Sequence, residues 1–155
     1  MLTAQFGQII TGSLVNMILI VSVMTCGLSV GLSVALVSPV AAKLLAIGPL
    51  WSIIPFILIG NATLVVLWHY IGRVKKLNQI TTYIIALITA AAAKFTVLYI
   101  GIVKIAIPFL LNLQDKQAAA VSSIFSLPQL LTASIGGIVA VIILPLIQKA
   151  IKNRV

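Results

Sequence analysis

Apolar residues are grouped along the chain into long runs, and most of these runs end at turn-forming or charged residues. A helix needs about 20 mainly apolar residues to cross roughly 30 Å of membrane hydrocarbon. Five segments of the chain reach this length: 6–26, 27–45, 50–72, 79–103 and 127–147. The pattern predicts an all-α membrane bundle of about five transmembrane helices. No separate water-soluble domain is visible, so we expect residues 1–155 to form a single integral membrane domain.

The fourth apolar run is longer than a single span requires. Apolar character continues from Ile80 to Leu113, and as one helix this stretch would extend about 50 Å at 1.5 Å per residue. Gly101 and Pro108 are the residues best able to break it. We therefore expect one span over 79–103, then a short interfacial piece within an outer loop over 104–126. Two short spans with a turn near Lys94 are the alternative, although no turn-forming residue marks that turn.

Charged residues are scarce, and almost all have one sign. They make up 7% of the chain, with ten basic residues and a single acid, Asp115. A soluble protein carries about 25% charged residues, so this composition cannot cover a water-exposed surface. The basic residues gather in 73–76 and 149–154, after the third and fifth runs, and such clusters face the cytoplasm. We therefore expect a cytoplasmic C-terminus, an N-terminus on the outer side and Asp115 in the outer loop.

Small residues recur at helical spacing in two of the runs. The repeat "GLSVGLSVA" has a period of four, and a similar face precedes Lys94 in the fourth run. The residues on these two stripes are Gly27, Gly31, Ala35, Ala86, Ala90 and Ala93. Small side chains let helices approach closely in lipid. The stripes therefore serve either internal packing or the docking of another membrane subunit.

Lys94 is the most unusual polar residue inside the predicted spans. It follows four alanines and lies roughly 22 Å along its helix from the start of the span. An ionisable side chain in a span costs about 2.5–3.5 kcal/mol to insert, so it normally faces protein or water. From this depth Lys94 either snorkels to the outer headgroups or faces a cavity. Because no span contains a carboxylate, its partner must be water, lipid phosphate, a backbone carbonyl or an anionic ligand.

Several classes of function are excluded by residues that the chain lacks. It has one His and one Cys, and no phosphate-binding loop of the G-x-x-x-x-G-K-[ST] type, so we expect neither an enzyme nor a metal or cofactor site. A proton-coupled exporter would need a carboxylate within the membrane. The basic residues lie at the ends of spans, which favours a lipid bilayer over nucleic acid as the partner.

Four phrases together resemble the substrate-binding membrane subunits, or S components, of energy-coupling factor (ECF) vitamin transporters. They are "GLSVGLSVALVSPVAAKLLAIGPL", "IPFILIGNATLVVLWHYIGR", "AAAAKFTVLYIGIVKI" and "LPQLLTASIGGIVAVIILPLIQKAI", about 120 residues in all. The shared features are a Gly-rich helix that ends in Ser-Pro, a helix that leads to a short basic loop, a small-residue run before a base, and a basic tail. That family has six helices, and its second corresponds to the first span here. The resemblance therefore implies a short form without the family's first helix.

The resemblance also implies a mechanism and a site. An S component is a bacterial plasma membrane protein that binds a vitamin-sized molecule in its own outward-facing cavity. A transmembrane coupling subunit and two ATPases then topple it to release the ligand inside the cell. By their positions, the residues expected to line the cavity are Asn16, Trp51, Asn61, Lys94, Tyr99 and Gln129. Lys94 in the cavity would favour an anionic ligand.

Two other classes of function remain open at the level of sequence. The chain could be a small anchor or assembly subunit of a larger membrane complex that transports nothing. It could also be a holin-like or channel-forming oligomer, although no span has the continuous polar stripe expected of a pore.

Overall fold

The structure is a computed structural model that describes residues 2–45 and 50–152. Most of these residues are helical. In chain order the elements are α1 (Leu2–Cys26), α2 (Leu28–Leu44), the 3₁₀-helix η1 (Trp51–Ile53), α3 (Ile54–Ile71), α4 (Gln79–Leu98), the π-helix η2 (Tyr99–Leu110), α5 (Asp115–Ile124) and α6 (Leu127–Lys152). Four helical runs are long and apolar enough to cross a membrane, and α2 is a shorter apolar helix. The predicted all-α membrane helix bundle is therefore confirmed for the described residues.

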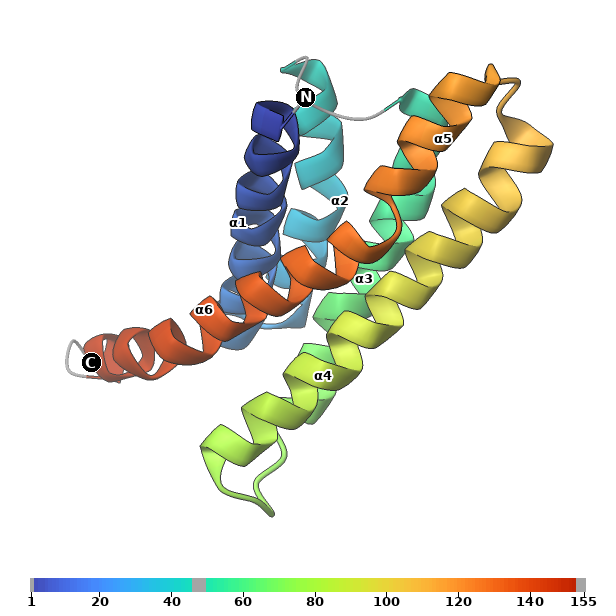
Figure 1. Cartoon of the computed structure of the whole chain (residues 1–155). Helices are drawn as coiled ribbons and strands as arrows, with labels where there is room; N and C mark the ends of the chain where they lie inside the picture. The colour runs from blue at the N-terminus through green and yellow to red at the C-terminus, as the bar shows by residue number, and fades with distance from the viewer. Residues whose placement is uncertain (1, 46–49, 153–155) are drawn as a thin grey trace.

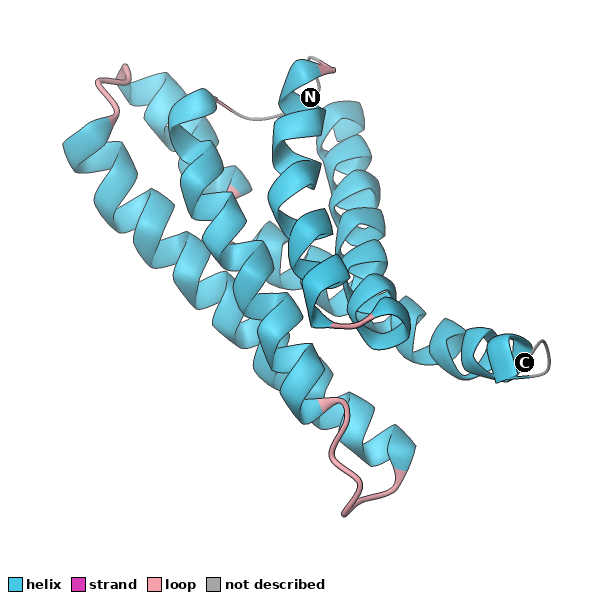
Figure 2. Cartoon of the chain, turned by 180° about the vertical axis from the view of Figure 1, so that it is seen from behind, coloured by secondary structure: helices cyan, strands magenta, loops and turns pink. Residues whose placement is uncertain are grey.

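The membrane helices run back and forth between the two ends of the bundle (Figure 1). α1 and α2 are antiparallel, and they are joined at Gly27, whose φ of 95° lies in the left-handed region that favours glycine. α3 and α4 form a second antiparallel pair, and α6 packs against both α1 and α4. α1 begins at the end of the bundle opposite to the end where α6 finishes, and the reverse view shows the same arrangement (Figure 2).

The fourth apolar run is one unbroken helix that changes from α-helical to π-helical geometry. α4 passes without a turn into η2, so the run spans Gln79–Leu110 and Lys94 lies in regular α-helix. The expected break at Gly101 is therefore wrong. This glycine instead allows α3 to come close, because a Cβ there would lie 2.7 Å from Cδ1 of Phe56. Pro108 also lies inside η2, where the wider i→i+5 turn continues past it.

The segment expected to be an outer loop, 104–126, is mostly helical. Its first part belongs to η2, and α5 occupies Asp115–Ile124. α5 packs on η2 and α6 near the end of the bundle where α1 begins (Figure 1). A search for long apolar runs cannot detect α5, because it has 10 residues and many of them are polar.

The apolar core consists of two clusters. The larger cluster holds most of the buried side chains of α1, α3, α4 and α6, and Trp68 and Leu19 are among its largest members. The smaller one consists of Ile53, Leu98, Ile102 and Phe125. Along α4, Lys94 lies between Ala91 of the larger cluster and Leu98 of the smaller one. A polar position therefore separates the two clusters on this helix.

The two small-residue stripes mostly face the inside of the bundle. Four of their members are buried: Gly31, Ala35, Ala86 and Ala90. The other two, Gly27 and Ala93, are half-buried. A Cβ on Gly31 would lie 2.7 Å from Cβ of Val23, so this glycine lets α2 pack closely on α1. The buried members therefore join helices of this chain to one another.

Candidate functional site: a buried lysine and two asparagines

Three polar side chains from three helices meet inside the bundle. Nζ of Lys94 on α4 donates one hydrogen bond to Oδ1 of Asn16 on α1, at 2.5 Å. It donates another to Oδ1 of Asn61 on α3, at 2.7 Å. The exposed fractions of Lys94, Asn16 and Asn61 are 3%, 1% and 2%. Lys94 therefore points into the bundle and does not snorkel, and the partners expected from the sequence were wrong, because side-chain amides accept its hydrogen bonds. We call these three residues the Lys94 cluster.

Asn16 is positioned by the close packing of α1 against α6. Gly136 of α6 lies against the α1 backbone, where a Cβ would overlap the carbonyl oxygen of Ser13 and lie 2.8 Å from Cβ of Asn16. In the preceding turn of α1, a Cβ on Gly12 would lie 3.0 Å from Cγ2 of Thr132. Glycines on both helices therefore bring the two backbones together beside Asn16.

Two hydroxyl groups extend the cluster to the remaining membrane helices. Nδ2 of Asn16 donates to Oγ1 of Thr132 on α6, and Nδ2 of Asn61 donates to Oγ of Ser38 on α2, both at 3.5 Å. These distances are long for N–H···O hydrogen bonds, so the two bonds are weak. The Thr132 hydroxyl donates in turn to the carbonyl oxygen of Gln129, at 3.1 Å. The polar layer thus reaches α1, α2, α3, α4 and α6.

The ammonium group of Lys94 has only neutral hydrogen-bond partners in this cluster. The single acid of the chain, Asp115, is an exposed residue in the first turn of α5. Removing an ion from water costs several kcal/mol even after the protein relaxes around it. Two amide oxygens solvate a cation but do not neutralise its charge. An ionisable residue in this setting is a strong candidate for a functional site.

The other three predicted ligand residues lie outside the Lys94 cluster. Trp51 is 57% exposed at the start of η1. Tyr99 is half-buried; its ring stacks on Phe95 with centroids 5.7 Å apart, and Nζ of Lys104 lies 5.5 Å from its centroid. Nε2 of Gln129 donates to a carbonyl oxygen at the end of α5, at 3.4 Å. Among these three, only Gln129 connects to the cluster, and it does so through its backbone.

Three hydroxyl residues near the cluster were absent from the set of predicted ligand residues. Ser38 and Thr132 hydrogen-bond to the asparagines, as described above. Ser13 is 8% exposed, and its Oγ has no hydrogen-bond partner within the described residues. Ser13 and Asn16 are three residues apart on α1, so they share one helix face. That spacing is the signal in the sequence that could have identified Ser13.

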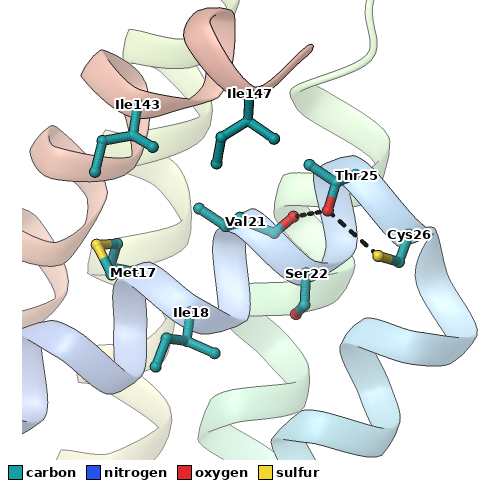
Figure 3. Close-up of a pocket in the computed structure, with 8 residues that line it drawn as sticks. All are labelled: Met17, Ile18, Val21, Ser22, Thr25, Cys26, Ile143 and Ile147. Carbon is teal, nitrogen blue, oxygen red and sulfur yellow. Dashed lines mark hydrogen bonds between the residues drawn. The ribbon is translucent and has the colours of Figure 1, made fainter. Parts of the chain in front are cut away.

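An apolar groove of about 330 Å³ lies elsewhere, between the C-terminal halves of α1 and α6 (Figure 3). Met17, Val21 and Cys26 line it from α1, and Ile143 and Ile147 line it from α6. None of the Lys94 cluster residues belongs to its lining. The groove is therefore a separate feature of the lipid-facing surface.

The fold and the Lys94 cluster together define a class of protein: an integral membrane helix bundle with a polar site enclosed among its helices. A family model described as "ECF transporter, substrate-specific component" matches residues 2–148, almost the whole chain. The chain therefore belongs to this family, whose members are substrate-binding subunits of transporters and not enzymes. Neither a curated protein nor a solved structure matches the chain.

Proposed function

We propose that the protein is the substrate-binding subunit of an ATP-driven energy-coupling factor importer for a small, vitamin-like metabolite. Family membership supports the transport role. The observation that carries the binding role is the enclosed cluster in which Lys94 joins Asn16 and Asn61. These three residues would hold the ligand. Trp51, Tyr99 and Gln129 lie in η1, in η2 and in the first turn of α6, and they would line the path by which a ligand enters.

The distribution of charge supports an orientation in which α1 begins outside the cell. Arg73, Lys75 and Lys76 lie in the loop between α3 and α4, and Lys149 and Lys152 lie in the last turn of α6. These two groups occupy the end of the bundle where α1 finishes (Figure 1). Because basic residues are retained on the cytoplasmic side, this end would face the cytoplasm of a bacterial cell.

Energy would come from partner proteins. The chain has no ATP-binding loop, so hydrolysis would take place in two ATPase subunits joined to it by a transmembrane coupling subunit. Internal packing buries Gly31, Ala35, Ala86 and Ala90. The coupling subunit would therefore contact the bundle through other residues, with Gly27 and Ala93 at the margin of any such surface.

Purification of the tagged chain from its native membrane tests the proposed function. We expect an integral membrane subunit and a pair of ATPases to co-purify with it, and native mass spectrometry to detect a bound small molecule. If neither partner nor small molecule is found across several expression conditions, the importer role is wrong. A small anchor or assembly subunit would then be the better interpretation.

A further inference from the structure

The Lys94 cluster has an excess of positive charge that the described residues do not balance. The Lys94 ammonium has three N–H donors, and two of them point at the amide oxygens of Asn16 and Asn61. Both acceptors are neutral, and the only acid of the chain is the exposed Asp115 on α5. One negative charge would therefore make the net charge of the cluster zero.

The geometry points to a carboxylate as the group that this cluster binds, an inference that rests on the proposed function. One negative charge would match the one positive charge of Lys94, whereas a phosphate with nearly two charges would leave an excess. A carboxylate also has two oxygens that can accept several hydrogen bonds at once. We propose that the ligand is a small monocarboxylate and that its carboxylate lies between Lys94 and the two asparagines.

The two asparagines can serve the cluster both with and without a ligand. Each amide has an oxygen that accepts and a nitrogen that donates, so a rotation of the amide exchanges the two. Among the described residues, the nitrogens of the two amides are held only by the 3.5 Å bonds to Thr132 and Ser38, and bonds of this length are weak. With a carboxylate present, Asn16 and Asn61 would turn their N–H groups towards it.

Ser13 provides an independent indication that a polar ligand group belongs here. Its hydroxyl is buried and has no hydrogen-bond partner within the described residues. Buried polar atoms are nearly always paired. Ser13 shares a face of α1 with Asn16 and lies one turn closer to the start of the helix. A ligand that reaches Lys94 from that end would supply the missing partner.

The sharpest test places a carboxylate in the cluster by substitution. Asn61→Asp changes one amide into a carboxylate of nearly the same size, next to Nζ of Lys94. This variant should unfold at a higher temperature than the wild type, because the lysine gains a charged partner, and it should no longer bind added carboxylates. Asn112→Asp adds the same charge at an exposed position and serves as the matched control.

The probes are acetate, benzoate and octanoate, each compared with its neutral amide, in thermal unfolding of the detergent-purified chain. At least one carboxylate should raise the unfolding temperature of the wild type by roughly 3–5 °C near ten times its Kd, and no amide should do so. The shift should be lost in Asn61→Asp and in Lys94→Met. It should persist in Asn112→Asp and in Lys104→Met, which removes an exposed lysine from the same long helix.

Three outcomes would overturn the carboxylate inference: equal shifts with acids and amides, shifts that survive Lys94→Met, or no shift with any of the three carboxylates at millimolar concentration. A rise in unfolding temperature for Asn61→Asp with undiminished carboxylate binding would also overturn it, since Lys94 would then have only a structural role. These experiments use the isolated subunit. If the ATPase pair co-purifies but no carboxylate binds, the ligand class is wrong and the proposed function stands.

Discussion

Burial of Lys94 depends on the two asparagines that accept its hydrogen bonds. A lysine at this depth could extend along its helix to the headgroups, but its helix face turns towards α1 and α3. There Asn16 and Asn61 offer oxygens at 2.5 and 2.7 Å. Hydrogen bonds to a charged donor contribute more than those between neutral groups. The position of this side chain is therefore a property of three residues together.

A double-mutant cycle measures how strongly Lys94 and Asn61 interact. Asn61→Leu should lower the free energy of unfolding by about 1.5–3 kcal/mol, because it removes an acceptor from a charged donor. In the Lys94→Met background the same substitution should cost much less. Reversible unfolding in mixed micelles provides the measurement. Equal losses in both backgrounds would mean that the two side chains do not interact.

At the scale of whole helices, glycines let α1 and α6 pack closely together, because they have no side chain. Gly136 of α6 lies directly on the backbone of α1, and Gly137 meets the side chain of Leu87 on α4. In lipid, helices gain little from burying apolar surface, and close packing between small residues replaces that contribution. This contact also fixes the position of Asn16.

Gly136→Ala should destabilise the protein, whereas Gly7→Ala should not. Alanine favours a helix over glycine by roughly 0.5–1 kcal/mol, and a Cβ on Gly7 would meet nothing within 4 Å. Gly7→Ala should therefore be neutral or stabilising. A Cβ on Gly136 would overlap a backbone oxygen that cannot move aside, so Gly136→Ala should lose about 1–3 kcal/mol. Thermal unfolding of the two variants gives the comparison, and a stabilising Gly136→Ala would refute the close contact.

At the scale of the whole molecule, one end of the bundle collects most of the basic residues. Arg73 contributes to the structure of that end, since Nη2 donates to the carbonyl oxygen of Val23 near the end of α1, at 2.9 Å. Cys26 and Ile147 line one groove there, so α1 and the last turns of α6 finish side by side (Figure 3). Lys43, Lys104 and Lys116 are the basic residues towards the opposite end.

The exposed Cys26 reports the orientation directly, because it lies at the basic end. If that end faces the cytoplasm, a membrane-impermeant maleimide added to intact cells should leave Cys26 unlabelled. It should label a cysteine introduced by Leu2→Cys in a Cys26→Ser background. Permeabilised cells, in which Cys26 should react, are the control. Labelling of Cys26 from outside intact cells would reverse the proposed orientation.

Much of the architecture could be predicted from the lengths of the apolar runs, but two features could not. Gly101 looks like a break in the sequence, whereas in the structure it provides space for Phe56 of α3. Whether a glycine bends a helix or admits a neighbour depends on what packs against it. The short helix α5 has too few residues and too little apolar character to stand out by its composition. The structure shows that it is a helix and that it packs on η2 and α6.

By itself, the sequence determined that the chain belongs in a membrane as an all-α bundle, because a composition with 7% charged residues and long apolar runs allows little else. It also selected Lys94, Asn16 and Asn61 as candidates, since polar residues inside spans are rare. Only the tertiary structure decided that these three meet, across separations of 78 and 33 residues. The reason is physical: a helix presents a side chain to every direction around its axis, and the packing of its neighbours alone determines which direction faces the interior.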